Sequence, residues 1–218
     1  MAERSDRGRR RAGADGVVSN GRRGVLDRLQ ERTGELGVGI YSFLLCLMTL
    51  ALSGVVGLAI EQPYLFPSLG PTVVLFFESP KQPAASAKHA VLGHLVAILV
   101  GAACLYGFGL GDDAAVTEQG LKPTRVVAAA LSVALTALLL RAIRSPHPPA
   151  GATTLLVSLG VLKSSTELVT MMLAVLLVTV VAVTFNRLLA VEHPLVPAHA
   201  RRRGTSRGAG GSGSSDVP

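Results

Sequence analysis

Long apolar runs alternate with short polar stretches along most of this chain. Four of the runs are close to the roughly 20 residues that a helix needs to cross the hydrocarbon core of a membrane. They do not alternate apolar and polar positions as a strand would, and they are rich in Leu, Ala and Val. The pattern therefore predicts four membrane-spanning helices, over residues 37–60, 89–110, 125–143 and 167–190.

Two further apolar pieces, residues 63–77 and 148–162, are shorter than a full span and begin with prolines and a glycine. The stretch "PSLGPTVVL" in the first aligns with "PPAGATTLL" in the second, so that Gly70 matches Gly151 and Thr72 matches Thr153. The distance along the chain from Gly70 to Gly151 also separates the long runs: it carries the first roughly onto the third and the second roughly onto the fourth. The chain therefore has two copies of one unit, a long helix, a short broken segment and a long helix.

The short segments are predicted to be broken helices. Proline has no backbone N–H and glycine disfavours a regular helix, so we expect the backbone to open at Gly70 and Gly151 and the helix to restart there. Open backbone at membrane depth must be buried in protein or line a cavity. Gly- and Pro-interrupted short segments in both halves of a membrane protein are typical of a transporter's binding site, into which the free N–H groups of the restarting helices point.

The sequence thus predicts an all-α membrane protein with four long transmembrane helices and two short broken or re-entrant helices. If the short segments cross the membrane, each unit has three crossings and the two repeats are inverted. Lys81, Lys88, Arg141 and Arg144 then share the side of the arginine-rich tails, as the positive-inside rule favours. The alternative, in which they dip in and return, places those residues outside.

Composition and charge divide the chain into three parts. Only 16% of the residues are charged, although the net charge is +7, because most charges lie near the ends. We expect a basic, largely disordered cytoplasmic tail over 1–35 with a short amphipathic helix at the membrane surface, a transmembrane domain over 36–190, and a flexible basic tail over 191–218. Arginines beside apolar spans indicate contact with the lipid bilayer rather than nucleic acid.

The polar residues do not form a recognisable cofactor or metal motif. Cys46 and Cys104 lie in apolar runs without CxxC spacing or flanking histidines, so we expect buried thiols and no metal site. The spans contain no HExxH, GxSxG or paired Asp, and the sequence therefore predicts no cofactor and no enzyme activity.

The stretches "SPHPPAGATTLLVSLG" and "PSLGPTVVLFFESPKQPAASAKHAVLGHLVA" resemble the HPP family of integral membrane proteins, named for the tripeptide His147-Pro148-Pro149. The resemblance covers residues 36–190. It implies four membrane spans and transport of a solute, because plant and cyanobacterial relatives are associated with nitrite. Some members carry a further regulatory domain after the membrane part.

The candidate binding residues lie at the two breaks and beside the Gly-His pair of the second span. His147 is a candidate solute or proton ligand, or else it orients the turn; His94 faces the bundle interior, or else bonds to a neighbour. The threonine hydroxyls either donate to an anion or cap the helices. The full set is His147, Pro148, Pro149, Gly151, Thr153, Thr154, Ser68, Gly70, Thr72 and His94.

These features favour a transporter or channel for a small solute, with a small anion such as nitrite bound where the two broken helices restart near the membrane midplane. A structural or regulatory membrane protein is the alternative, and a membrane-embedded enzyme is a weaker one. We expect a bacterial-type plasma (inner) membrane with both tails in the cytoplasm. Homo-oligomer formation is left open by the sequence.

Overall fold

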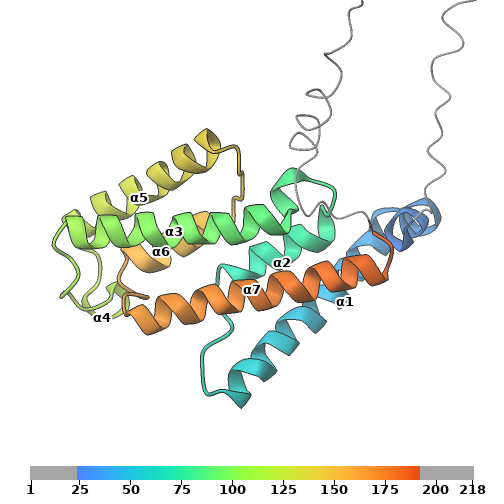
Figure 1. Ribbon diagram of the computed structural model, residues 1–218, viewed down its shortest axis with the longest axis horizontal. Helices are drawn as coiled ribbons and strands as arrows, with labels where there is room; N and C mark the ends of the chain where they lie inside the picture. The colour runs from blue at the N-terminus through green and yellow to red at the C-terminus, as the bar shows by residue number, and fades with distance from the viewer. Residues whose placement is uncertain (1–23, 192–218) are drawn as a thin grey trace, which may run out of the picture.

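The computed structural model describes residues 24–191, which fold into a bundle of α-helices (Figure 1). The predicted disordered tails lie mostly outside the described residues. The four long helices are α1 (Val25–Ala59), α3 (Ala87–Gly107), α5 (Pro123–Ala142) and α7 (Ser165–Leu188). The shorter ones are α2 (Leu69–Glu78), η1 (Pro83–Ala85), α4 (Val116–Gln119) and α6 (Ala150–Ser158).

The helix boundaries follow from local sequence. Pro123 begins α5, where a missing N–H costs nothing. Ser86 caps α3, and Ser164 and Glu167 form a reciprocal capping box at the start of α7. In α1 the backbone at Gly34 has φ 61°, so a kink separates the predicted surface helix from the membrane span.

The helices α2 and α6 each follow a segment without helix, residues 63–66 and 145–147. In each case the segment and the helix after it carry the chain from one end of the bundle towards the other. At one end, the tail end, Val25 N–H donates to the Leu189 carbonyl (3.2 Å) and Lys81 pairs with Asp27 (2.7 Å). At the opposite end, the α4 end, Tyr106 donates to the Lys163 carbonyl (3.2 Å). Figure 1 shows α2 directed towards the tail end and α6 directed towards the α4 end.

The helix order is long, short, long in each half, as the sequence predicts. Within a half, the first long helix packs against the short one, α1 on α2 and α5 on α6. Across the halves, α1 packs on α7, α5 packs on α3, and each short helix packs against the last helix of the other half. This packing agrees with two related units, and their inverted symmetry stays a prediction.

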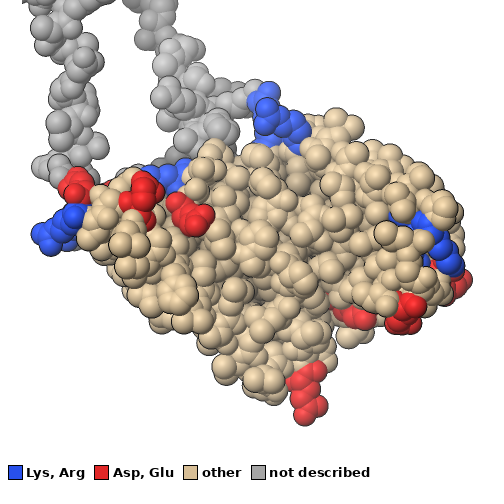
Figure 2. All heavy atoms as spheres, turned by 180° about the vertical axis from the view of Figure 1, so that it is seen from behind, with Lys and Arg blue, Asp and Glu red and all other residues tan. Residues whose placement is uncertain are grey.

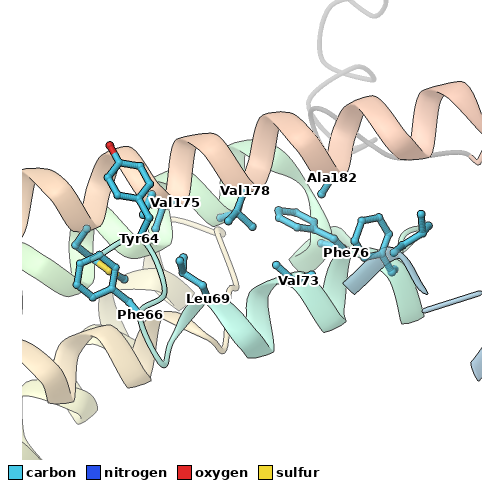
Figure 3. Close-up of a cluster of buried hydrophobic side chains, with 14 of the residues drawn as sticks. Tyr64, Phe66, Leu69, Val73, Phe76, Val175, Val178 and Ala182 are labelled. Atoms are coloured by element: carbon cyan, nitrogen blue, oxygen red, sulfur yellow. The ribbon is translucent and has the colours of Figure 1, made fainter. Parts of the chain in front are cut away.

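Apolar side chains fill the space between α2 and α7. Leu69, Val73 and Phe76 are completely buried and face Val175 and Val178 (Figure 3). One face of α2 is thus packed against α7, while Val74 on its other side is exposed.

The outer surface is apolar over most of its area. Large hydrophobic side chains of the long helices are exposed, for example Phe43 at 64% and Leu58 at 81%. On the face in Figure 2, lysine, arginine and acidic residues lie at the ends and margins, and the surface between them is uncharged. The four long helices have the length and hydropathy of membrane spans, so the chain is an integral membrane protein whose helices contact lipid.

Candidate functional site

His94 of α3 joins the two short helices. Its Nε2 lies 3.0 Å from Oγ1 of Thr72 on α2, and its Nδ1 lies 2.7 Å from Oγ1 of Thr153 on α6. All three side chains are completely buried. His94 is about one helical turn from the middle of α3, on the tail-end side. The aligned threonines of the two halves thus meet at one imidazole.

One arrangement of protons satisfies all of these groups. The Thr72 hydroxyl lies 3.0 Å from the Ser68 carbonyl, which can only accept, so Thr72 donates there and accepts from Nε2–H of His94. Nδ1 then lacks a hydrogen and accepts from the Thr153 hydroxyl. The neutral imidazole is therefore the middle member of a directional chain, from Thr153 through His94 and Thr72 to Ser68.

His147 lies directly beside this chain. Its ring meets that of His94 edge to face, with 5.1 Å between the ring centroids. Its Nδ1 donates to the carbonyl of Ala84 in η1 (2.9 Å), and its Nε2 is buried without a hydrogen-bond partner among the described residues. A Cβ on Gly93 would lie 2.8 Å from Cβ of His147, so only glycine allows this approach of the two segments.

The start of α6 differs from the predicted geometry. The N–H groups of Ala150, Gly151 and Ala152 donate to the carbonyls of the three residues His147, Pro148 and Pro149, each at 3.1 Å. The expectation of free N–H groups here is therefore wrong for these three. The expected opening at Gly151 is also wrong, because Gly151 lies in the first turn of α6. Residues 145–147, before the two prolines, lie outside any helix or turn, and Pro149 is already in the helical region of the backbone.

The remaining predicted residues divide between the two short helices. Thr154 does not face His94: its Oγ1 donates to the Ala150 carbonyl and contacts Oγ1 of Thr136 on α5 (3.0 Å). Ser68 is fully buried just before α2, and its hydroxyl has no partner among the described residues. Gly70 lies in the first turn of α2, so the opening expected at this glycine is wrong as well. The binding roles of these residues stay predictions.

A cavity of about 300 Å³ lies beside the start of α6. We call it the α5–α6 cavity, because its walls come from α5 and from the segment that leads into α6. Its lining is mostly apolar, and among the described residues Arg141 is the one charged residue that lines it. The lining residues are Val133, Thr136, Ala137, Leu140, Arg141, Pro146, His147, Pro148 and Gly151.

Two buried polar side chains that the sequence analysis missed fix the short helices. Arg125 of α5, 1% exposed, donates to the carbonyl of Leu159 just after α6 (2.6 Å) and to that of Ala114 in the loop before α4 (3.1 Å). Asn186 of α7, completely buried, donates to the Phe76 carbonyl of α2 (3.1 Å). Both are polar residues within predicted spans, and this signal could have identified them.

A small group of charges surrounds Arg125 at the α4 end. Asp113 accepts from Lys122 (3.0 Å) and lies 3.7 Å from Arg125. The hydrogen bond from Lys122 holds the pKa of the Asp113 carboxyl below its usual value. Across the described residues 24–191, no three His, Cys, Asp or Glu side chains form a group that could hold a metal ion.

Comparison with known proteins agrees with this architecture. The family described as "HPP, transmembrane region" matches residues 31–194. A transmembrane protein of Dictyostelium discoideum is 36% identical over 96 residues, which cover 44% of this chain and 28% of that protein. The match thus spans less than a third of the relative's length. No solved structure matches the chain.

Proposed function

Since this chain belongs to the HPP transmembrane family, we propose that it is a transporter or channel that moves a small solute across the membrane, with a small anion such as nitrite as the first candidate. The observation that carries this proposal is the buried contact of His94 with Thr72 and Thr153. Ionisable residues inside membrane proteins are costly and mark solute or proton pathways. In transporters with repeated halves, discontinuous helices from both halves form one site.

The conformation described here has the polar groups of this site closed on one another. His94, Thr72 and Thr153 have no exposed surface, and their hydrogen bonds are made within the protein. A solute would reach them only if one of the short helices moved and a threonine left the imidazole. We therefore infer that transport alternates between this closed arrangement and one in which a hydroxyl donates to the solute.

The choice of an anion rests on charge. Arg141 lines the α5–α6 cavity at its tail-end side, and no carboxylate is among the lining residues. The hydroxyls of Thr72 and Thr153 can turn to donate to a negative ligand. Nitrite remains the first candidate because of its association with other members of the family.

The same charges suggest an orientation. Among residues 24–191, more lysines and arginines lie at the tail end than at the α4 end, which favours both tails in the cytoplasm of a bacterial-type plasma membrane. Those at the tail end are Arg28, Arg32, Lys81, Lys88, Arg141, Arg144 and Arg187, and those at the α4 end are Lys122, Arg125 and Lys163.

Transport is a better account than enzyme activity or a structural role. The Thr153 hydroxyl donates to His94, which is the geometry of a nucleophile and its base. In a catalytic triad, a carboxylate on the other side of the imidazole stabilises the imidazolium that forms. Here that place is taken by Thr72, whose neutral hydroxyl stabilises an imidazolium less. A structural membrane protein would not need a buried imidazole between two repeat-related hydroxyls.

The direct test is uptake into proteoliposomes that contain the purified protein. Nitrite, nitrate, formate and chloride are offered in turn, and protein-free liposomes are the blank. We expect saturable uptake of at least one of them, and a loss of that uptake in His94→Gln. Uptake no faster than the blank for every solute would overturn the proposal.

A further inference from the structure

One buried acceptor atom beside the α5–α6 cavity has no partner. Nε2 of His147 makes no hydrogen bond with any described residue, although the side chain is 2% exposed. Because Nδ1 donates its hydrogen to the Ala84 carbonyl, the neutral ring carries only a lone pair on Nε2. His147 is also one of the residues that line the cavity. What the site lacks is thus a proton or a hydrogen-bond donor for Nε2.

Within residues 24–191, the groups that face His147 carry no negative charge that could balance a proton there. From α3, His94 contacts its ring and His89 is near enough to interact with it electrostatically. From α5, Arg141 shares the cavity wall, and η1 contributes the Ala84 carbonyl. A proton on Nε2 would therefore create a buried charge beside a second cation, and such a charge is costly without a partner.

An anion in the cavity would in turn need more positive charge and more hydrogen-bond donors than the lining supplies. Its lining is mostly apolar, so an anion that enters it loses hydration and gains Arg141 as its charged neighbour. A proton on His147 would supply a charge-assisted hydrogen bond to that anion. Each charge thus reduces the cost of the other, and by linkage the proton and the anion bind cooperatively.

We propose that the α5–α6 cavity binds a small monovalent anion of a weak acid together with one proton, which His147 Nε2 and an oxygen of the anion share. The proposal rests on the anion transport proposed above and names its co-substrate. One proton is taken up with each anion, whether the proton is on His147 Nε2 or on the anion oxygen. The proton and the anion that cross the membrane together are therefore electrically neutral. The cavity of about 300 Å³ is large enough to hold an anion of this size.

Calorimetric titration of the intact, detergent-solubilised protein with sodium nitrite tests the proposal. The titration is repeated near pH 7 in buffers that differ in ionisation enthalpy, so that the slope of the observed heat gives the number of protons taken up. We expect about one proton per nitrite in the wild-type protein, because a neutral His147 gains a proton when the anion binds.

His147→Asn is the informative variant, since an asparagine amide can still donate to the Ala84 carbonyl but has no atom at the place of Nε2. We expect it to bind nitrite about tenfold or more weakly, because a hydrogen bond to a charged ligand is lost, and to take up no proton. His89→Asn is the matched control. His89 is also a buried histidine of this region, bonded to the Pro83 carbonyl (2.8 Å), and its replacement should leave proton uptake unchanged.

The outcomes separate this proposal from the proposed function. Nitrite binding without proton uptake, or with uptake that persists in His147→Asn, would overturn the shared proton and leave anion transport standing. Absence of both binding and uptake for nitrite, nitrate and formate would overturn both. In proteoliposomes, the proposal further expects nitrite uptake to follow an imposed pH gradient and to be insensitive to membrane potential; uptake driven by potential alone would contradict it.

Discussion

At the scale of single residues, the site depends on a few close approaches. His94 lies 22 residues after Thr72 and 59 before Thr153 in the chain, yet it bonds to both. The sequence singled out all three by residue type and by the aligned repeat. Their contact could not be predicted, because it is a product of how α2, α3 and α6 pack.

Two glycines near the site are expected to respond in opposite ways to substitution by alanine. Gly93→Ala places a Cβ 2.8 Å from Cβ of His147, so we expect overpacking to cost about 1 to 3 kcal/mol. Gly151→Ala meets no atom within 4 Å and replaces a helical glycine, so it should be neutral or stabilising by up to about 1 kcal/mol. Thermal unfolding in detergent measures both. Equal losses would contradict the packing described here.

At the scale of helices, the sequence predicted the elements better than it predicted their ends. The four spans and both short helices were anticipated from apolar runs and prolines. Gly151 was assigned the break, but the prolines at 148 and 149 end the extended segment themselves, and proline is favourable at the start of a helix. The helices η1 and α4 were not predicted, because three or four residues carry too little periodicity.

The C-terminus of α6 should depend on Arg125. Arg125→Met removes two buried hydrogen bonds to carbonyls, at Leu159 and Ala114, and we expect a loss of about 2 to 3 kcal/mol in the free energy of unfolding. Lys122→Met is the control, because its pair with Asp113 is at the surface and contributes about 1 kcal/mol or less.

Gly160 provides a second test of the same contact. Its backbone has φ +74°, and a Cβ there would lie 2.6 Å from Nη1 of Arg125. We therefore expect Gly160→Ala to lower the melting temperature, as Arg125→Met does. In the double variant the two effects should add only in part, because the contact with Arg125 is gone while the strain at the positive φ stays. Full additivity would show that Gly160 and Arg125 act independently.

At the scale of the whole molecule, the chain crosses the bundle with its short segments as well as its long helices. Glu61, between α1 and α2, and Gln82, between α2 and α3, are exposed and lie on either side of the first short helix in the chain. Single cysteines there, with Cys46 and Cys104 replaced by alanine, should react with an impermeant thiol reagent from opposite sides of the membrane. Gln82→Cys should be accessible from the cytoplasm. Labelling of both from one side would mean that the segment that contains α2 returns to the side it came from.

The central claim is that the two halves contribute equivalent hydroxyls to one site. The most direct measurement is the apparent affinity for the transported anion in Thr72→Val and Thr153→Val, which keep the shape of the side chain and remove the hydroxyl. Both should weaken affinity by about ten- to a hundredfold, the effect of one lost hydrogen bond to a charged group. Thr184→Val, on an exposed face of α7, should leave it unchanged. Wild-type affinity in both folded variants, or a loss in only one, would contradict a site shared between the halves.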